Sequence, residues 1–322
     1  MATLYGLALG DALGMPSQTL TRDEIRQHYG VIEEFVAPFA GHPVSDGLSA
    51  AQVTDDTEQA LLLAQRLIAT PTRFDPAGWA RDLLEWEAGV RARGLLDLLG
   101  PSSKATLEAI RQGVDPGEAA KHGTTNGAAM RIAPVGLLVP PSDLSALVDR
   151  VEETCRVTHN TGEAIAGAAA VAAYISAKIS GAEDALPLAL RAAELGQRRG
   201  HPAGVDDIPS RIARAVALAE SGDFTAEIGT SVATHDSVPA AFGILQLARG
   251  DVWQAGLLAA NIGDDTDTIG AIACAMCGAG AGMAGLPADR VAQLRAANPL
   301  NIEAVTQGLV TLRGTAPQEA AL

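Results

Sequence analysis

The stretch Asn261-Ile262-Gly263-Asp264-Asp265-Thr266-Asp267-Thr268 places three carboxylates and two threonines directly before an uncharged run, residues 269–285. Carboxylates this close repel one another, so they need a bound cation, hydrogen bonds or raised pKa values. The run behind them is short for a bilayer span and rich in Gly and Ala, which favours a buried central helix. The stretch therefore predicts a helical core with an acidic cluster at its mouth.

A second acidic cluster, Thr54-Asp55-Asp56-Thr57, also precedes an apolar run of helical period. Either cluster alone has the pattern of a capped helix start with solvated acids. Two such clusters favour a shared metal site, and oxygen ligands from Asp and Thr suit Mg²⁺, Mn²⁺ or Ca²⁺ better than Zn²⁺. A pair of ions there could orient a water and a vicinal diol or a phosphate.

Composition favours an all-α fold. The chain of 322 residues is 48% hydrophobic and 19% charged, which is typical of a globular protein. Aromatic residues make up only 3% of it, whereas Ala and Gly are abundant, so closely approaching helices are favoured over β-strands. Because no segment is rich enough in Pro, Gly or Ser to separate domains, we expect a single compact domain over residues 1–322.

The formal charge of −15 argues against nucleic acid or an anionic membrane as the main partner. The three cysteines give no disulfide framework, which favours a reducing compartment, and the N-terminus lacks the basic start of a signal peptide. We therefore expect a cytoplasmic protein, and a monomer. Cys274 and Cys277 lie in an Ala/Gly-rich helical pattern and are expected to pack in the core.

Local signals place the other polar motifs at helix starts. Thr21 and Glu24 have the spacing of a capping box, and residues 31–53 are expected to form a loop. Polar residues 234–239 are expected to precede an apolar helix over residues 240–247. The turn at residues 100–104 could offer free N–H groups to a phosphate or be an ordinary connection. His159, at another helix entrance, could cap, pack or act as a ligand.

Four segments together resemble the ADP-ribosylglycohydrolase family. They are GLALGDALGMP (6–16), VTDDTEQALLLA (53–64), TNGAAMRIAPVGLL (125–138) and NIGDDTDTIGAIACAMCGA (261–279), and they span nearly the whole chain in the family's order. The resemblance implies an all-α orthogonal helical bundle with a centre of two Mg²⁺ or Mn²⁺ ions. It also implies hydrolysis at the anomeric carbon of a terminal ribose, which releases ADP-ribose from a protein side chain or a small molecule.

Carried over by motif, the resemblance assigns functional residues in three groups. The metal ligands would be Thr54, Asp55, Asp56, Asp265, Asp267 and Thr268. The ADP-ribose pocket would be lined by Gly100, Ser102, Ser103, Gly123, Thr124, Asn126 and His159. The catalytic candidates are Asp55, Asp56 and the loop position Gln18, with a water activated by Asp55 or Asp56 as the nucleophile.

Two positions depart from the family's pattern. Asp264 stands where Gly is frequent and adds a negative charge beside the ligands. Gln18 stands where hydrolases of the family commonly carry Glu, and Gln cannot serve as a general acid or base. Either Asp23 or Glu24 takes that role, or an aspartate carries the chemistry, or the substrate differs. A catalytically silent ADP-ribose-binding protein and an N-glycosidase acting on a nucleoside therefore remain as alternatives.

Overall fold

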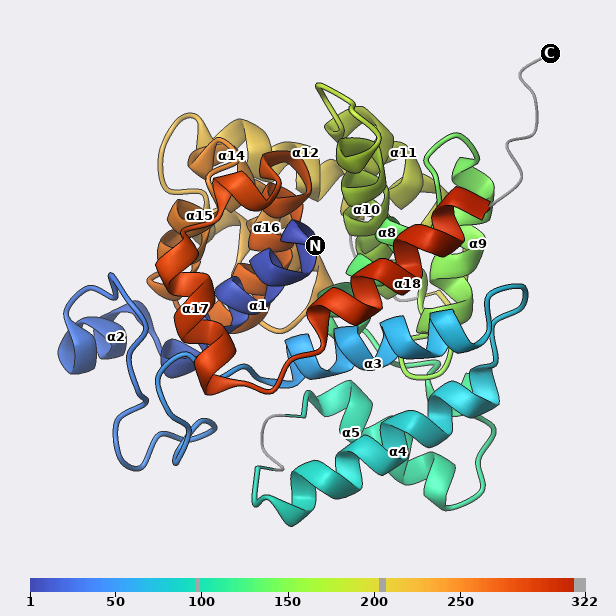
Figure 1. Ribbon diagram of the computed structural model, residues 1–322, viewed down its shortest axis with the longest axis horizontal. Helices are drawn as coiled ribbons and strands as arrows, with labels where there is room; N and C mark the ends of the chain where they lie inside the picture. Colours follow the sequence, from blue (N-terminus) through green and yellow to red (C-terminus); the bar gives the residue numbers. More distant parts are fainter. Residues whose placement is uncertain (96–98, 203–206, 316–322) are drawn as a thin grey trace.

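Two apolar helices, α1 (Ala2–Gly14) and α16 (Thr266–Ala281), pack against each other at the centre of the molecule (Figure 1). This computed structural model describes residues 1–95, 99–202 and 207–315. Glycine at every fourth position of α1 brings the two backbones into contact. A Cβ at Gly6 would lie 2.3 Å from the carbonyl oxygen of Cys274, and a Cβ at Gly10 would lie 2.1 Å from that of Gly270. Small residues therefore hold the central helix pair together.

The remaining helices surround this pair. Their bounds are α2 (Arg22–Tyr29), α3 (Asp55–Ala69), α4 (Pro76–Ala92), α5 (Pro101–Arg111), α6 (Pro116–Ala119), α7 (Gly127–Met130), α8 (Ala133–Leu138), α9 (Leu144–Cys155), α10 (Gly162–Ile179), α11 (Leu186–Gly196), α12 (Ile208–Ala219), α13 (Thr225–Ile228), α14 (Thr234–Ala248), α15 (Val252–Ala260), α17 (Ala288–Ala297) and α18 (Ile302–Thr315), with 3-10 turns at η1 (Met15–Ser17) and η3 (Met283–Gly285). Across the described ranges, β structure is limited to three isolated bridges. The predicted all-α fold is confirmed.

Local capping explains several helix starts. Thr21 and Glu24 form the predicted reciprocal capping box at the start of α2. Asp75 accepts a hydrogen bond from the backbone N–H of Gly78 at 2.9 Å, and Pro76 occupies the first position of α4. Residues 31–53 contain no helix, as expected.

α14 begins earlier than the sequence predicts. Residues 234–239 form its first turns rather than preceding it, although Pro239 lies inside the helix. Proline has no N–H to donate to the carbonyl of His235, one turn earlier. The Nε of Arg211 donates to that carbonyl at 2.6 Å, so α12 replaces the missing hydrogen bond and the helix can include the proline.

The alanine-rich helix α10 is a core helix. By length and composition it could cross a membrane, but 83% of it is buried inside the fold, against helices that include α8, α11 and α16. Cys274 and Cys277 on α16 are also buried, and the Cys274 thiol donates to the Val252 carbonyl at 3.2 Å. The expectation that these cysteines pack in the core is confirmed.

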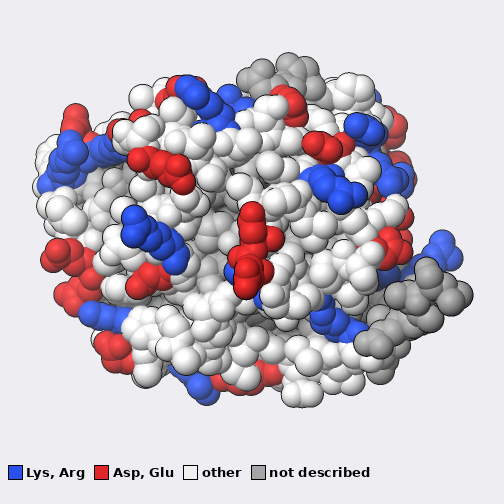
Figure 2. Space-filling view, turned by 90° about the horizontal axis from the view of Figure 1, so that it is seen from above, with Lys and Arg blue, Asp and Glu red and all other residues white. Residues whose placement is uncertain are grey.

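Charged side chains are mixed on the face shown in Figure 2. Lys and Arg lie singly or in small groups among Asp and Glu, and no continuous basic band crosses this face. An extended electropositive surface, which the backbone of a nucleic acid requires, is therefore absent from this face.

Candidate active site

The two acidic clusters meet in one pocket of about 130 Å³. α3 and α16 both begin at this pocket, so residues from two helix N-termini face the same space. Its lining comprises Gln18, Thr19, Val44, Asp55, Leu99, Gly100, Pro101, Ser103, Thr125, Asn126, Gly127, Met130, Val232, Asp265, Asp267 and Thr268. Segments separated by up to 250 positions in the sequence therefore contribute to one site.

Asp11, in the middle of α1, holds the start of α3 in place. Its fully buried carboxylate accepts hydrogen bonds from the backbone N–H and the hydroxyl of both Thr54 and Thr57, at 2.5 to 3.1 Å. Burial raises the pKa of Asp11 to about 6 in spite of these donors. Sequence reasoning gave Asp11 no role. A lone acid inside an otherwise apolar, buried helix is the signal that could have identified it.

The predicted metal ligands are close together but only partly satisfied by hydrogen bonds. Asp56 Oδ2 accepts from Thr54 Oγ1 at 3.2 Å and from Thr268 Oγ1 at 3.5 Å. Among the described residues, no donor reaches the other oxygen of Asp56, Oδ1, or Oδ1 of Asp267, although both atoms are buried. A buried carboxylate oxygen without a partner is costly unless a cation takes that place.

Burial and mutual repulsion raise the pKa values of these carboxyl groups. Burial, and then the neighbouring charge of Asp267, raise the pKa of Asp55 well above its usual range. Burial likewise raises the pKa values of Asp56 and Asp267 well above the usual range, and repulsion from other aspartates adds to the effect. The pKa of Asp265 is raised to about 6, chiefly by burial, against the hydrogen bond from Asn126. A divalent cation would oppose the repulsion among these carboxylates and so lower their pKa values.

The residues present fit hard divalent cations. They offer carboxylate and hydroxyl oxygens, which Mg²⁺ and Mn²⁺ prefer, and two buried oxygens that hydrogen bonds leave free. Within the described ranges, no three His, Cys, Asp or Glu side chains are already closed around one point as a metal site. The candidate ligands thus lie near one another without being closed around a single point.

Asn126 joins the acidic clusters to a wall that the sequence motifs did not indicate. Its Nδ2 donates to Asp265 Oδ2 and to Ser237 Oγ, and its backbone N–H donates to the Val232 carbonyl at 3.0 Å. The backbone N–H of Asp265 donates to the Thr230 carbonyl, also at 3.0 Å. Residues 230–233 therefore form one side of the site through their backbone, which explains why no side-chain pattern marks them.

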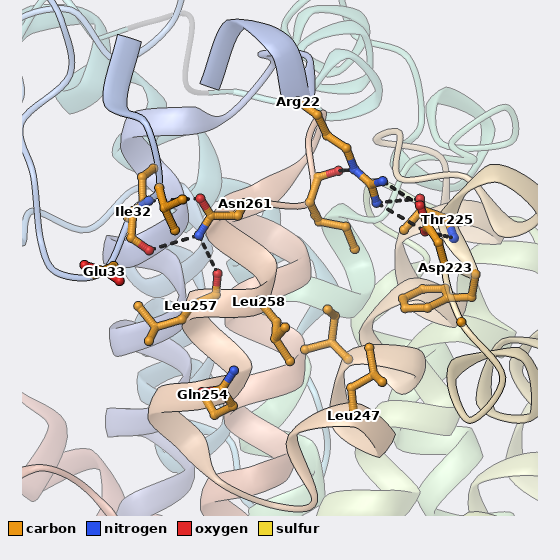
Figure 3. A pocket seen from close by; sticks show the side chains of 15 residues that line it. Arg22, Ile32, Glu33, Asp223, Thr225, Leu247, Gln254, Leu257, Leu258 and Asn261 are labelled. Atoms are coloured by element: carbon orange, nitrogen blue, oxygen red, sulfur yellow. Dashed lines mark hydrogen bonds and ion pairs between the residues drawn. The ribbon is translucent and has the colours of Figure 1, made fainter. Parts of the chain in front are cut away.

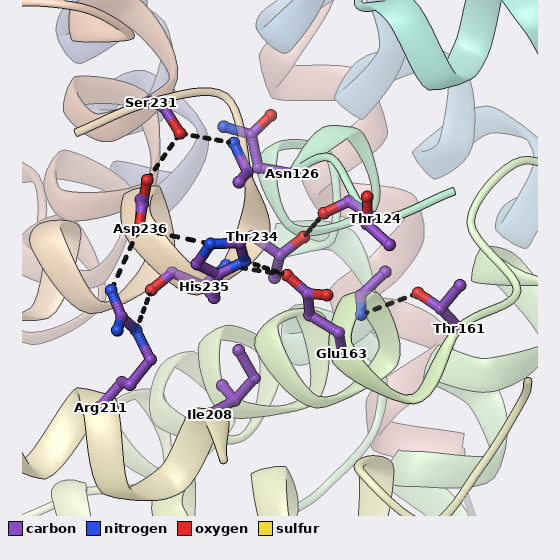
Figure 4. A network of polar contacts seen from close by, with 12 residues as sticks. Thr124, Asn126, Thr161, Glu163, Ile208, Arg211, Ser231, Thr234, His235 and Asp236 are labelled. Carbon is purple, nitrogen blue, oxygen red and sulfur yellow. Dashed lines mark hydrogen bonds and ion pairs between the residues drawn. The ribbon is translucent and has the colours of Figure 1, made fainter. Parts of the chain in front are cut away.

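A polar network fixes the beginning of α14 directly after this wall (Figure 4). The fully buried Glu163 accepts from the backbone N–H of His235 at 3.2 Å and lies 2.6 Å from its Nδ1. Arg211 pairs with Asp236 at 3.0 Å. Thr234 donates from both its backbone N–H and its hydroxyl to the Thr124 carbonyl. The network connects α10, α12 and α14 behind the pocket.

His159 supports the pocket wall from behind. It is fully buried and does not line the pocket, and its Nε2 lies 3.0 Å from the hydroxyl of Thr125, which does. Burial lowers the pKa of His159 well below its usual range, so the ring is neutral. A Cβ on Gly127 would come within 2.8 Å of this ring, which explains the glycine at that position. His159 thus lies one residue layer behind the pocket surface.

Some of the other predicted pocket residues line the pocket, whereas others, like His159, lie outside its lining. Gly100 and Ser103, at the start of α5, line the pocket together with Asn126. Ser102, Gly123 and Thr124 are not part of the lining. The Gly123 carbonyl accepts a hydrogen bond from Thr161, which caps α10, and the Thr124 carbonyl accepts from Thr234 on α14, so these two residues connect the wall to the core.

Gln18 lies in the pocket wall directly after η1. It is 6% exposed, and its Nε2 donates to Ser45 Oγ at 2.8 Å. The two acids considered as replacements, Asp23 and Glu24, lie on the exposed side of α2, where Glu24 closes the capping box. Neither lines the pocket, so the two acids lie outside the site, whereas Gln18 and Thr19 line it.

Asp264 occupies a backbone conformation that favours glycine. Its φ of 60° lies in the left-handed region, and Thr19, whose φ is 67°, donates from its N–H to the Asp264 carbonyl at 2.6 Å. Asp tolerates this region better than most residues do, whereas a β-branched Thr is rare there. The departure at position 264 therefore has a conformational explanation, and the paired segments form an edge of the pocket.

A larger hollow of about 490 Å³ lies next to the beginning of the acidic stretch (Figure 3). Asn261 is bonded there to the backbone N–H and carbonyl of Ile32, at 2.9 Å each. Arg22 donates to the Ile262 carbonyl at 2.8 Å and pairs with Asp223 at 2.7 Å. Because these polar groups bond to one another, they hold the beginning of the acidic stretch in place and are not available to bind a ligand in the hollow.

Comparison with known proteins identifies the family. The model of the ADP-ribosylglycohydrolase family matches residues 1–319. The uncharacterized protein YegU of Escherichia coli K12 is 35% identical over 97% of this chain and 96% of its own length. The ADP-ribosylarginine hydrolase Tri1 of Pseudomonas putida GB-1 is 30% identical over 89% of this chain and 72% of its own. A solved structure of an ADP-ribosylglycohydrolase-related protein complex has a TM-score of 0.69 and 26% identity, and the match covers 97% of this chain and 96% of that one. The chain belongs to the ADP-ribosylglycohydrolase family, whose members hydrolyse glycosyl bonds.

Proposed function

We propose that the protein is a divalent-metal-dependent hydrolase that cleaves the anomeric bond of ADP-ribose conjugates. The observation that carries the proposal is that two helix N-termini meet at one small pocket lined by Asp55, Asp265 and Asp267. One buried oxygen of Asp267, and one of Asp56 next to the lining residue Asp55, receive no hydrogen bond. The ligands proposed for two Mg²⁺ or Mn²⁺ ions are Thr54, Asp55, Asp56, Asp265, Asp267 and Thr268. When bound, such ions orient ribose hydroxyls and water and offset negative charge.

Asp55 is the better placed of the two candidate bases. It lines the pocket, whereas Asp56 is 1% exposed and bonded to Thr54 and Thr268. Water attacks the anomeric carbon, the bond from that carbon to the acceptor nitrogen or oxygen breaks, and the acceptor leaves with the bonding pair. The proton of the water passes to the Asp55 carboxylate, which lines the pocket.

The size of the pocket supports a ribose as the group that enters it. A space of about 130 Å³ is well below the several hundred Å³ that a whole nucleotide-sized ligand fills. The rest of an ADP-ribosyl group would extend past Gly100 and Ser103, where the first N–H groups of α5 can receive a phosphate. Because one relative carries the name ADP-ribosylarginine hydrolase, an arginine conjugate is the first acceptor to test.

Turnover of defined conjugates tests the proposal. The purified chain is incubated with ADP-ribosyl-arginine, ADP-ribosyl-serine, O-acetyl-ADP-ribose and simple nucleosides, with Mg²⁺ or Mn²⁺ or with a chelator, and product is followed by chromatography. We expect metal-dependent release of ADP-ribose, lost in Asp55→Asn and Asp267→Asn. It should be kept in Asp289→Asn, a matched change at a carboxylate whose side chain is 72% exposed.

Gln18 favours a second candidate, an ADP-ribose-binding protein without turnover, because an amide lies where an acid or base could act. Calorimetry separates the two candidates. Metal-dependent binding of ADP-ribose without hydrolysis of any conjugate supports the binding protein, whereas release from a nucleoside alone supports an N-glycosidase. If the protein shows no binding of ADP-ribose and no turnover of any conjugate or nucleoside, all three candidate functions are contradicted.

A further inference from the structure

The side chain of Gln18 is a buried amide on the pocket wall. It is 6% exposed and lies in the same lining as Asp55, Asp265 and Asp267. A buried amide has to satisfy both a donating nitrogen and an accepting oxygen, because each costs free energy when left unpaired. Which of the two faces the pocket decides what Gln18 can bind.

Ser45 determines the direction of this amide. Its hydroxyl donates to the Met15 carbonyl at 2.9 Å, and a carbonyl oxygen can only accept, so the single hydroxyl proton of Ser45 is already used. Gln18 lies 2.8 Å from the same hydroxyl oxygen. Only the amide nitrogen can face it, because the amide oxygen would oppose another acceptor.

Ser45 is itself fixed by the loop that carries it. It is fully buried, and its backbone N–H donates to Nδ1 of His42 at 2.9 Å. The N–H of Val44, which also lines the pocket, donates to the same nitrogen at 3.2 Å. Because Nδ1 accepts both bonds, His42 is neutral, and burial lowers its pKa accordingly. The hydroxyl of Ser45 therefore has a fixed position and a fixed polarity.

We propose that Ser45 is a positioning residue that holds Gln18 with its Oε1 available to the pocket, where Oε1 accepts a hydrogen bond from a ribose hydroxyl. Within the described chain, Oε1 receives no hydrogen bond. The inference rests on the proposed function, since it names the part of that function's substrate that Gln18 recognises. The pair of residues selects an amide at position 18 and excludes a carboxylate.

The exclusion has two physical causes. A carboxylate at position 18 would face an oxygen of Ser45 that has no proton left to donate, and it would add a negative charge to a wall of buried aspartates. When protonated, however, the same group could donate to Ser45 and still present a carbonyl oxygen to the pocket. The effect of Gln18→Glu should therefore depend on pH.

Calorimetry with ADP-ribose on the full chain, with Mg²⁺ present, tests the inference without requiring turnover. Ser45→Ala and Gln18→Met should each weaken binding about fivefold to tenfold, the value of one hydrogen bond, and the double variant should be no weaker than Gln18→Met. Ser49→Ala is the matched control, because it removes an exposed hydroxyl from the same loop and should leave the dissociation constant unchanged. Melting temperatures verify that each variant is folded.

Kinetics give the second readout. Gln18→Glu should lower kcat/KM by about tenfold or more at about pH 8, and its activity relative to wild type should rise as the pH falls. In the Ser45→Ala background the same substitution should cost less. The inference is overturned if Gln18→Glu is as active as the wild type or more active at about pH 8, or if Ser45→Ala binds ADP-ribose as tightly as the wild type. In either case, turnover by the wild type still supports the proposed function. A wild type that neither binds ADP-ribose nor hydrolyses a conjugate overturns both.

Discussion

Substitution of Gly14 by alanine should damage the site through the backbone of α16. Gly14 ends α1, and a Cβ there would lie 2.4 Å from the backbone N of Asp267 and 2.4 Å from the carbonyl carbon of Thr266. Ordinary contact begins at 3.4 Å, so the first turn of α16 has to withdraw by roughly 1 Å. That turn carries Asp267 and Thr268, two of the proposed metal ligands.

Gly6→Ala provides a control with the same steric problem in a different place. Its Cβ would lie 2.3 Å from the Cys274 carbonyl oxygen, on the same two helices. Cys274 is seven residues beyond Asp267, which is about 10 Å along α16. Overpacking costs about 1–3 kcal/mol, and replacing a helical glycine returns up to about 1 kcal/mol, so each variant should lose about 1–2 kcal/mol of stability.

Urea unfolding and metal titration together separate the two effects. We expect similar losses of stability in the two variants. Only Gly14→Ala should also lose metal-induced stabilisation and activity, by about tenfold to a hundredfold for a 1 Å displacement of ligands. Gly89→Ala, on an exposed face of α4 with open space around it, should be neutral or stabilising. Equal metal affinity and equal kcat/KM in Gly14→Ala and Gly6→Ala would refute the reasoning.

Because the folded-state pKa values of the buried aspartates are raised, these groups hold more protons in the metal-free protein than in the unfolded chain, so stability should fall as the pH rises from about 4 through about 6 and beyond. Ions that need the carboxylates ionised should raise the melting temperature more at about pH 8 than at about pH 5.5. Asp11→Asn should destabilise the metal-bound protein by about 2 kcal/mol in urea unfolding, because an amide offers a single accepting oxygen to four donors. Asp264→Gly should keep full activity, whereas Asp264→Val should lower the free energy of unfolding by about 1–3 kcal/mol because of the φ of 60°; equal melting temperatures would contradict this.

The helix starts at the site could be predicted because their signals are local. The clusters at residues 54–57 and 265–268 each carry polar helix-start residues before an apolar run, and α3 begins after Thr54 as predicted. α16 begins at Thr266, so residues 266–268 form its first turn rather than preceding it, and it ends at Ala281 rather than at residue 285. The capping box of α2 is likewise contained in four residues. The presence of two such clusters predicted that they share one site, and resemblance to a family added a ribose as the group bound there.

The long-range partners could not be predicted in this way. Asp11 contacts Thr54 across 43 positions, and Gln18 contacts Ser45 across 27, with no periodicity that links them. The predicted start of α14 was wrong. Pro239 leaves the carbonyl one turn earlier without its usual donor, but Arg211 supplies a donor, so the helix continues through the proline. In each case the deciding hydrogen bond comes from an element that the local sequence does not contain.

Arg131 shows how the fold supports an acidic site before any ion binds. It is 1% exposed, has no acidic ion-pair partner in the described chain, and donates to Gln59, whose Nε2 donates in turn to Asp55 at 3.1 Å. Burial lowers its pKa only to about 10, so it remains charged at neutral pH. Arg131 and the two helix N-termini supply roughly two positive charges, against the negative charges of five buried carboxylates when all of them are ionised.

The protein's own charges therefore leave an excess of negative charge at the site. A pair of divalent ions, as proposed, would more than offset the excess and leave a weakly positive pocket. Such a pocket suits a ligand that carries a diphosphate. It also explains how a chain with a net charge of −15 can attract an anion at this one place, since the local balance rather than the overall charge acts over a few Å.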